Sequence, residues 1–222
     1  MGDPPRNEAT QLSAPDSWAG LLALLSNCLG RPDEALETAV TSGSVQEDVE
    51  RLAEATGIDV PSDQPTAAEL SLTEDFEALF GAYRTPFAPP AASPYKEWYG
   101  DQTQGLMEGP PATRMEERLE ALSVSVPAAY PADHVALQLE YASLLAEAGE
   151  HEELSAFVET ELDWIDAFAG MVEEATAAAP FHRWSVSLLT ESMVTLRGEL
   201  GVTGPTEEQI ETMMDRVRPT VT

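Results

Sequence analysis

Apolar side chains recur every three or four residues along most of the chain, a spacing that places them on one face of an α-helix. Alternation of apolar and polar residues, the pattern of a strand, occurs only at residues 123–126, which are too few to build a sheet. We therefore expect an all-α fold, a single globular domain of about eight to ten helices. The segments with helical spacing are about 17–29, 33–41, 45–56, 66–82, 113–122, 133–148, 152–178, 181–200 and from 206 onward.

Two of these segments carry more information than the others. Residues 133–148 have two apolar stripes instead of one, which predicts a central helix covered on both sides. Residues 152–178 keep helical spacing over about six turns, so that we expect one long helix there, ended by Pro180.

The beginning of the chain is polar. Residues 1–15 contain three prolines and predict a disordered tail, so that we expect the helical domain over residues 16–222. The same segment lacks the basic stretch and the apolar run of a secretion signal. No segment approaches the roughly 18 consecutive apolar residues of a membrane span. We therefore expect a cytoplasmic protein with no direct insertion into a membrane.

Four prolines between residues 84 and 94 exclude a helix interior in this part of the chain. They leave two interpretations, a linker between domains or an ordered loop. The aromatic residues Tyr95, Trp98 and Tyr99 follow directly, whereas flexible linkers are poor in aromatic residues. The sequence therefore favours an ordered loop that packs on the core.

The net charge adds a constraint on partners. The chain has 222 residues, and its 40 acidic side chains against 11 basic ones give a net charge of −29. This charge argues against nucleic acid as a partner, because phosphate backbones attract lysine and arginine. At 43% hydrophobic residues the composition is still that of a globular domain. Scattered carboxylates and a single lysine, Lys96, indicate a halophilic source, with an acidic protein from an ordinary cell as the alternative.

Residue patterns typical of catalysis or cofactor binding are missing. The chain has no Gly-x-Ser-x-Gly nucleophile motif, no phosphate-binding P-loop and no dinucleotide fingerprint. Its three histidines form no metal-binding pair, and the lone Cys28 excludes an intrachain disulfide and is expected to be a small buried side chain. We expect no catalytic activity, no cofactor and no metal site. An enzyme of unknown type would need a cleft with converging acids.

Three motifs remain after these exclusions. They are an acidic and aromatic segment at 75–80, an aromatic segment at 94–99 behind the proline-rich loop, and the segment 130–140, which opens a long helix with Asp133 and His134. Each also has a purely structural explanation, with the aromatic residues as core and Asp133 as a helix N-cap. The candidate peptide-binding residues in these motifs are Phe76, Leu79, Phe80, Pro94, Tyr95, Trp98, Tyr99, Asp133 and His134.

In this order the three motifs resemble those of the TorD/DmsD/NarJ family of redox-enzyme maturation chaperones. The resemblance covers about residues 70–185, and the helix start at Asp133 and His134 is its most specific element. It implies an all-helical cytoplasmic chaperone for a molybdenum-containing oxidoreductase. Such a chaperone binds the twin-arginine signal peptide, or another segment of the apo-form of the catalytic subunit, before the cofactor is inserted and the enzyme is exported.

The chemistry of the candidate residues agrees with a ligand that is both cationic and apolar. The aromatic residues can line an apolar groove. The carboxylate of Asp133 can pair with an arginine through two parallel hydrogen bonds. A helical adaptor or regulatory module unrelated to redox enzymes remains the alternative function, and the identity of the client would separate the two.

Lowering the salt concentration should destabilise the folded chain. Repulsion among the 40 acidic side chains is screened beyond about 3 Å at 1 M salt but only beyond about 10 Å at 0.1 M. We expect circular dichroism to show full helix content in molar KCl and a partial loss near 0.1 M. Unchanged helicity and an unchanged melting temperature at low salt would contradict adaptation to high salt.

Overall fold

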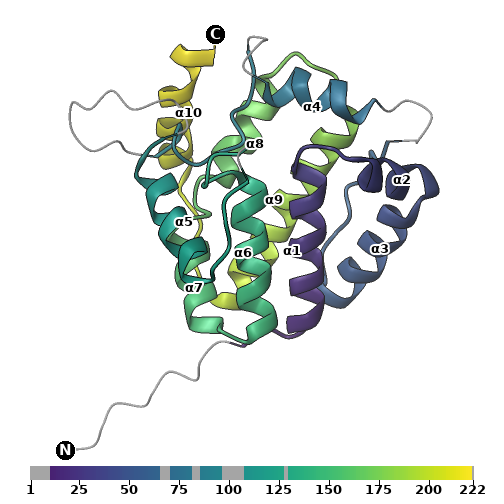
Figure 1. Cartoon of the computed structure of the whole chain (residues 1–222), viewed down its shortest axis with the longest axis vertical. Coiled ribbons are helices and arrows are strands. Elements are labelled where there is room, and N and C mark those ends of the chain that lie inside the picture. Colours follow the sequence, from purple (N-terminus) through teal and green to yellow (C-terminus); the bar gives the residue numbers. More distant parts are fainter. Residues whose placement is uncertain (1–10, 66–70, 82–85, 97–107, 128–129, 222) are drawn as a thin grey trace, which may run out of the picture.

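The computed structural model describes residues 11–65, 71–81, 86–96, 108–127 and 130–221. Within these ranges the chain forms ten helices and no strand, which confirms the predicted all-α fold (Figure 1). The helices are α1 (Pro15–Leu29), α2 (Glu34–Ser42), α3 (Ser44–Thr56), α4 (Leu72–Phe80), α5 (Pro110–Ala121), α6 (Val135–Ala148), α7 (His151–Thr160), α8 (Ile165–Glu174), α9 (Pro180–Leu200) and α10 (Glu207–Val221).

Helices α1 and α6 lie side by side through the centre of the molecule and make its most extensive helix–helix contact (Figure 1). Two serine hydroxyl groups join them. Ser26 donates a hydrogen bond to the carbonyl of Ala136 at 2.8 Å, and Ser143 donates one to the carbonyl of Ala19 at 2.9 Å. Most residues of α6 are buried, so the predicted central helix covered on both sides is confirmed.

The remaining helices surround this pair. Helices α2 and α3 flank α1 at one edge of the molecule, whereas α5 and α7 lie on the other side of α6 (Figure 1). Helix α9 packs against α1, α4, α7 and α8, and α10 packs against α8. Their buried faces form one continuous apolar core, and the tryptophans at 18, 164 and 184 are its largest members.

The prediction of a single long helix over residues 152–178 is wrong. The chain instead forms α7 and α8, separated by a turn at residues 161–164. The turn buries Glu161, Leu162 and Trp164 as completely as a helix would. The apolar spacing therefore continues across the turn, and periodicity alone could not reveal the break.

Three of the helices that begin earlier than their patterns predict begin with a proline. Helix α1 begins at Pro15, α5 at Pro110 and α9 at Pro180. A proline costs little in the first turn of a helix, because its missing N–H would have no intrahelical partner there. Of the helix predicted over 66–82, residues 72–80 form α4, while 66–70 and 82 lie outside the described residues.

The candidate strand at 123–126 and the predicted tail at 1–15 are described only in part or form no regular element in their described residues before Pro15. Residues 124–127 form no strand and have no regular structure. Of the predicted tail, residues 1–10 lie outside the described part of the chain. Leu12 is buried, and Ser13 donates two hydrogen bonds of 2.9 Å to the carboxylate of Glu199 in α9.

The proline-rich loop packs on the core over its described residues 86–96, as expected of an ordered loop. The amide of Val135, the first residue of α6, donates a hydrogen bond to the carbonyl of Pro90 at 2.8 Å. The amide of Gly109, just before α5, donates one to the hydroxyl oxygen of Ser93 at 2.9 Å. The loop is therefore tied to the beginnings of both α5 and α6.

Replacement of Gly109 by alanine should destabilise the protein. The new Cβ would lie 2.9 Å from the hydroxyl oxygen and 3.0 Å from the Cβ of Ser93, a short side chain that has little freedom to move. We expect a loss of about 1–3 kcal/mol in the free energy of unfolding, the usual cost of overpacking. Denaturant unfolding in molar KCl measures this loss.

Gly198→Ala is the matched control for this change. Gly198 lies inside α9, and a Cβ there would meet no described atom within 4 Å. Alanine should therefore stabilise the helix by about 0.5–1 kcal/mol. If Gly109→Ala were as stable as the wild type, the close contact between the loop and α5 would be contradicted.

Candidate functional site

The carboxylate of Asp133 is completely buried where the proline-rich loop meets the start of α6. Its Oδ2 atom accepts two hydrogen bonds from Ser93, one from the backbone amide and one from the hydroxyl group, each 2.6 Å long. Its Oδ1 atom has no hydrogen-bond partner among the described residues. Buried carboxylate oxygens are rarely left unbonded, because the missing contact with water is costly. This atom is therefore a candidate for contact with a ligand.

Burial also changes the acidity of this carboxyl group. It raises the pKa of Asp133 to about 6, and the hydrogen bonds from Ser93, the backbone amide of Asp133 itself and the positive charge of Arg114 offset only part of the increase. At pH 7.5 the group is ionised, although burial penalises its charged form. An additional cation at Oδ1 would relieve this penalty.

A second buried carboxylate, that of Glu161, is in the opposite situation. Arg114 donates to its two oxygens from Nε and from a terminal guanidinium nitrogen, both at 2.8 Å, and Arg118 donates to Oε1 at 3.1 Å. Burial would raise the pKa of Glu161, but these hydrogen bonds and positive charges hold it below its ordinary value. Glu161 is thus a neutralised structural carboxylate that joins α5 to the turn between α7 and α8.

His134, and not Asp133, is the N-cap of α6. Its Nδ1 atom accepts a hydrogen bond from the amide of Ala136 at 3.2 Å, and its ring packs on that of Tyr130 with the ring centres 4.5 Å apart. Burial lowers the pKa of His134 to about 3, so the imidazole is neutral and its nitrogen can accept. The N-cap interpretation of Asp133 is therefore wrong, because its carboxylate is turned toward the loop and Ser93.

The aromatic motif behind the loop is also interior in its described part. Pro94 and Tyr95 are buried, and the Tyr95 hydroxyl donates to the carbonyl of Pro89 at 3.1 Å. The Tyr95 ring lies 5.1 Å from that of Trp164 and 6.4 Å from that of Phe168. The candidates Trp98 and Tyr99 lie outside the described residues.

The acidic and aromatic motif forms the end of α4 and contacts a buried histidine. Leu79 and Phe80 are buried, and Phe76 is partly buried. The ring of His182 in α9 lies 5.6 Å from both Phe76 and Phe80 and 5.4 Å from Phe181. Neither nitrogen of His182 has a hydrogen-bond partner among the described residues, and burial lowers its pKa to about 4.

The fold brings the three motifs into one connected region. The ring of Phe168 in α8 lies 5.7 Å from that of Phe80 and also contacts that of Tyr95. Two residues before Tyr95, Ser93 contacts Asp133. The described candidate residues are therefore neighbours, but none of them is an exposed anchor. Their part in peptide binding stays a prediction.

Two residues of this region were not identified from the sequence. Ser93, which donates hydrogen bonds to Asp133, is a polar residue among alanines and prolines. Only this contrast could have identified it from the sequence. Glu161 is an acidic residue at a position where the helical spacing over 152–178 would place an apolar one. A charged residue at such a position indicates a buried ion pair.

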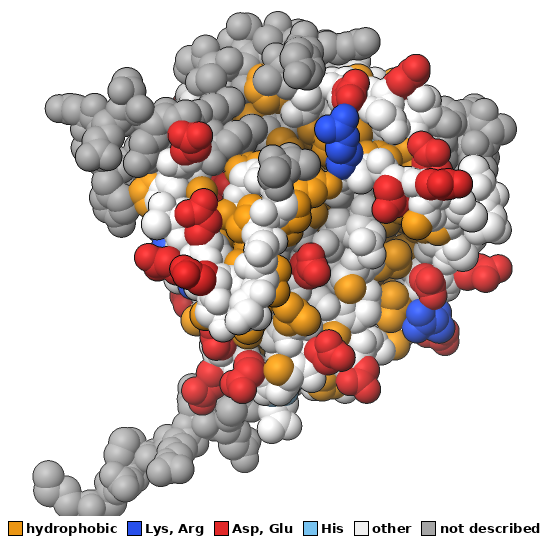
Figure 2. All heavy atoms as spheres, viewed as in Figure 1, with side chains coloured by type: hydrophobic (Ala, Val, Ile, Leu, Met, Phe, Trp, Pro, Cys, Tyr) orange, Lys and Arg blue, Asp and Glu red, His pale blue; other side chains and the backbone are white. Residues whose placement is uncertain are grey.

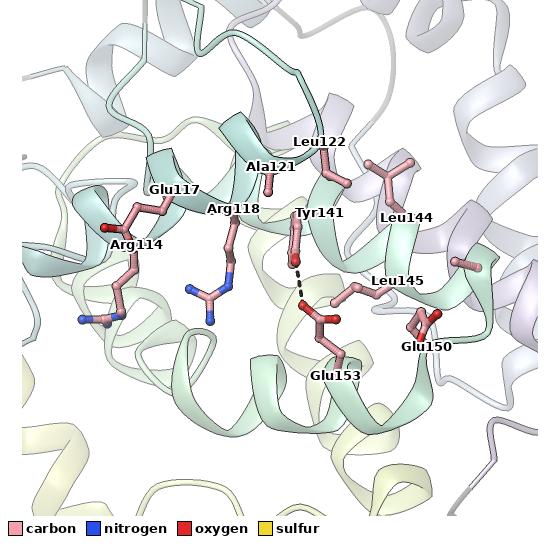
Figure 3. Close-up of a pocket in the computed structure, with 11 residues that line it drawn as sticks. Arg114, Glu117, Arg118, Ala121, Leu122, Tyr141, Leu144, Leu145, Glu150 and Glu153 are labelled. Atoms are coloured by element: carbon pink, nitrogen blue, oxygen red, sulfur yellow. Dashed lines mark hydrogen bonds between the residues drawn. The ribbon is translucent and has the colours of Figure 1, made fainter.

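An open groove of about 700 Å³ lies between α5, α6 and α7 (Figure 3). It combines leucine side chains with charges of both signs, on a molecule whose carboxylates are spread widely over the face seen in Figure 2. The Tyr141 hydroxyl donates to a carboxylate oxygen of Glu153 at 2.9 Å inside it. The sequence analysis did not predict this groove. Its lining residues are Arg114, Glu117, Arg118, Ala121, Leu122, Tyr141, Leu144, Leu145, Ala148, Glu150 and Glu153.

The described residues contain no group of three or more His, Cys, Asp or Glu side chains arranged to hold a metal ion. None of their helices is long and apolar enough to span a membrane. Cys28 is a free thiol, buried as predicted, and burial raises its pKa to about 12.

The chain was compared with known protein families. A family model described as nitrate reductase delta subunit matches residues 41–177. The matched stretch contains the described proline-rich loop, the junction of Asp133 with Ser93, and the three helices that form the groove. No curated protein matches the chain.

Replacement of His182 by phenylalanine should make the protein less sensitive to acid. The folded-state pKa of about 4 lies below the ordinary value of 6.5, so stability present above pH 6.5 is lost as the pH falls toward 4. This loss is on the order of 3 kcal/mol at pH 4, and phenylalanine would abolish it.

Denaturant unfolding of both proteins at pH 7.5 and pH 4 measures the difference. His134, which has a lowered pKa of about 3, loses stability in the same direction but is common to both proteins. An equal loss of stability in the wild type and His182→Phe would contradict the burial of a neutral histidine.

Proposed function

The chain belongs to the nitrate reductase delta subunit family, and we propose that it binds the twin-arginine signal peptide, or another apo-form segment, of a molybdopterin oxidoreductase catalytic subunit in the cytoplasm. The family is part of the TorD/DmsD/NarJ group of chaperones for molybdoenzyme maturation, so the resemblance carried by the three motifs is confirmed. Binding would precede cofactor insertion and export. This function needs no catalytic residue in the chaperone.

The observation that carries the proposal is the unbonded Oδ1 atom of Asp133. Its carboxylate is ionised at neutral pH, and Ser93 uses only the other oxygen. A guanidinium group from the client would supply both the missing hydrogen bond and a positive charge. Twin-arginine signals offer two such groups beside an apolar stretch.

Asp133 is fully buried, so the proposal requires the loop to move when the client binds. The two hydrogen bonds from Ser93 hold the loop in place, and an arginine with its five N–H donors can replace them. Pro94 and Tyr95 belong to the same loop. Its movement would uncover Tyr95, one of the aromatic side chains that the sequence predicts as peptide anchors.

Four affinities test the recognition of arginine by Asp133. They are those of the wild type and of Asp133→Asn for a synthetic twin-arginine signal peptide and for its twin-alanine version. The wild type should bind the arginine peptide at least tenfold more tightly, since each charge-assisted contact contributes about 1.5–3 kcal/mol. Asparagine keeps an acceptor for Ser93 but removes the charge, so the variant should bind both peptides about equally. Calorimetry in molar KCl gives the four values.

Asp48→Asn is the matched control, because it makes the same change of charge at an exposed carboxylate of α3 paired with Arg51. This variant should discriminate between the two peptides as the wild type does. The pH supplies a second control. Between pH 7.5 and 5 the carboxylate of Asp133, with its pKa of about 6, takes up a proton. The preference for arginine should therefore shrink in the wild type and in Asp48→Asn, whereas Asp133→Asn should show no preference at either pH.

Equal binding of both peptides by the wild type at pH 7.5 would contradict arginine recognition. Binding only to a mature segment of the apoenzyme would assign recognition to another part of the client. A pull-down from the native cytoplasm would identify the co-purifying large subunit. It would also distinguish this function from that of an adaptor unrelated to redox enzymes.

A further inference from the structure

Large apolar side chains are exposed at only four of the described positions, and two of these line the groove between α5, α6 and α7. Leu122 is 47% exposed and Leu144 is 41% exposed. A third, Val124, follows Leu122 two positions along the chain. The fourth, Val194 on α9, is not part of the groove. Exposed apolar side chains that gather in a concave site are typical of a binding surface.

The charged side chains of the groove lie toward both of its ends, and Glu117 lies at the same end as Arg114 and Arg118 (Figure 3). At one end Arg114 and Arg118 donate to the buried carboxylate of Glu161, so much of their positive charge is neutralised within the protein. At the other end Glu150 and Glu153 lie beside the leucines (Figure 3). The leucine end is therefore apolar and acidic, a combination that suits an apolar ligand with a basic group.

We propose that this groove is a second docking surface for the client, occupied by the apolar stretch of the same segment whose arginine binds Asp133. This inference rests on the proposed function. Apolar side chains of the client pack against Leu122 and Leu144, and a flanking lysine or arginine pairs with Glu150 or Glu153. A net charge of −29 favours such a basic occupant over an acidic one.

The length of α6 sets the distance between the two contacts. Asp133 stands two residues before α6, and Leu144 stands nine positions after Val135, its first residue (144 − 135), which corresponds to about 14 Å along the helix at 1.5 Å per residue. An extended peptide covers this length of α6 with about four residues, and a helical one with about nine. One signal peptide is therefore long enough to occupy both sites, and the joined contacts reinforce each other.

The test compares the full-length wild type with Leu144→Gln and with its matched control Val194→Gln. Both variants replace an exposed apolar side chain on a helix by the same neutral polar one, and Val194 is 59% exposed outside the groove. The two probes are a synthetic peptide with an arginine pair and an apolar stretch, and the same peptide with serines in place of the apolar residues. Calorimetry in molar KCl measures binding, and thermal melting verifies folding.

We expect Leu144→Gln to weaken binding of the apolar peptide at least tenfold and to leave binding of the serine peptide unchanged. Val194→Gln should bind both peptides as the wild type does. Unchanged affinity in Leu144→Gln, or equal weakening in both variants, would overturn the inference. The proposed function would still be supported if the wild type prefers the twin-arginine peptide over its twin-alanine version. A wild type that binds neither peptide would overturn both. If Leu144→Gln melts at a lower temperature, Leu122→Gln at the end of α5 provides the same comparison.

Discussion

The two hydrogen bonds from Ser93 to Asp133 join parts of the chain that are forty residues apart. They hold the proline-rich loop against the start of α6, and through the amide of Gly109 the same serine also reaches the start of α5. A carboxylate leaves water only when such bonds replace those of the solvent. Because one oxygen of Asp133 remains unbonded, this junction has both a structural role and an unused capacity to bind a cation.

Asp133 and Glu161, the two buried carboxylates among the described residues, show how differently such a group can be accommodated. Glu161 is held by two arginines of α5 and has a lowered pKa, so its charge is satisfied within the fold. Asp133 receives hydrogen bonds from one serine and has a raised pKa. An incoming cation therefore has more to gain at Asp133, and this difference separates a structural carboxylate from a candidate for recognition.

The described aromatic candidate residues lie in or against the core, which affects how a client could be recognised. Tyr95 and Phe80 both contact Phe168 of α8, so they contribute to the core in this conformation. Among the described residues, Leu122 and Leu144 are the exposed large apolar side chains that line the groove, so an apolar ligand could reach them without rearrangement. In the function that we propose, recognition divides into an open apolar part along α6 and a closed polar part at its beginning, and only the second depends on movement of the loop.

The sequence by itself determined the helices, the doubly covered α6, the ordered loop and the family motifs. These properties depend on local spacing, because a side chain three or four positions from another shares its face whatever the rest of the chain does. Tertiary structure alone decided the break at residues 161–164, the capping of α6 by His134, the burial of Tyr95 and the existence of the groove. Each of these depends on which distant elements meet. The contacts that bury a side chain or satisfy its hydrogen bonds come from residues that local periodicity does not identify.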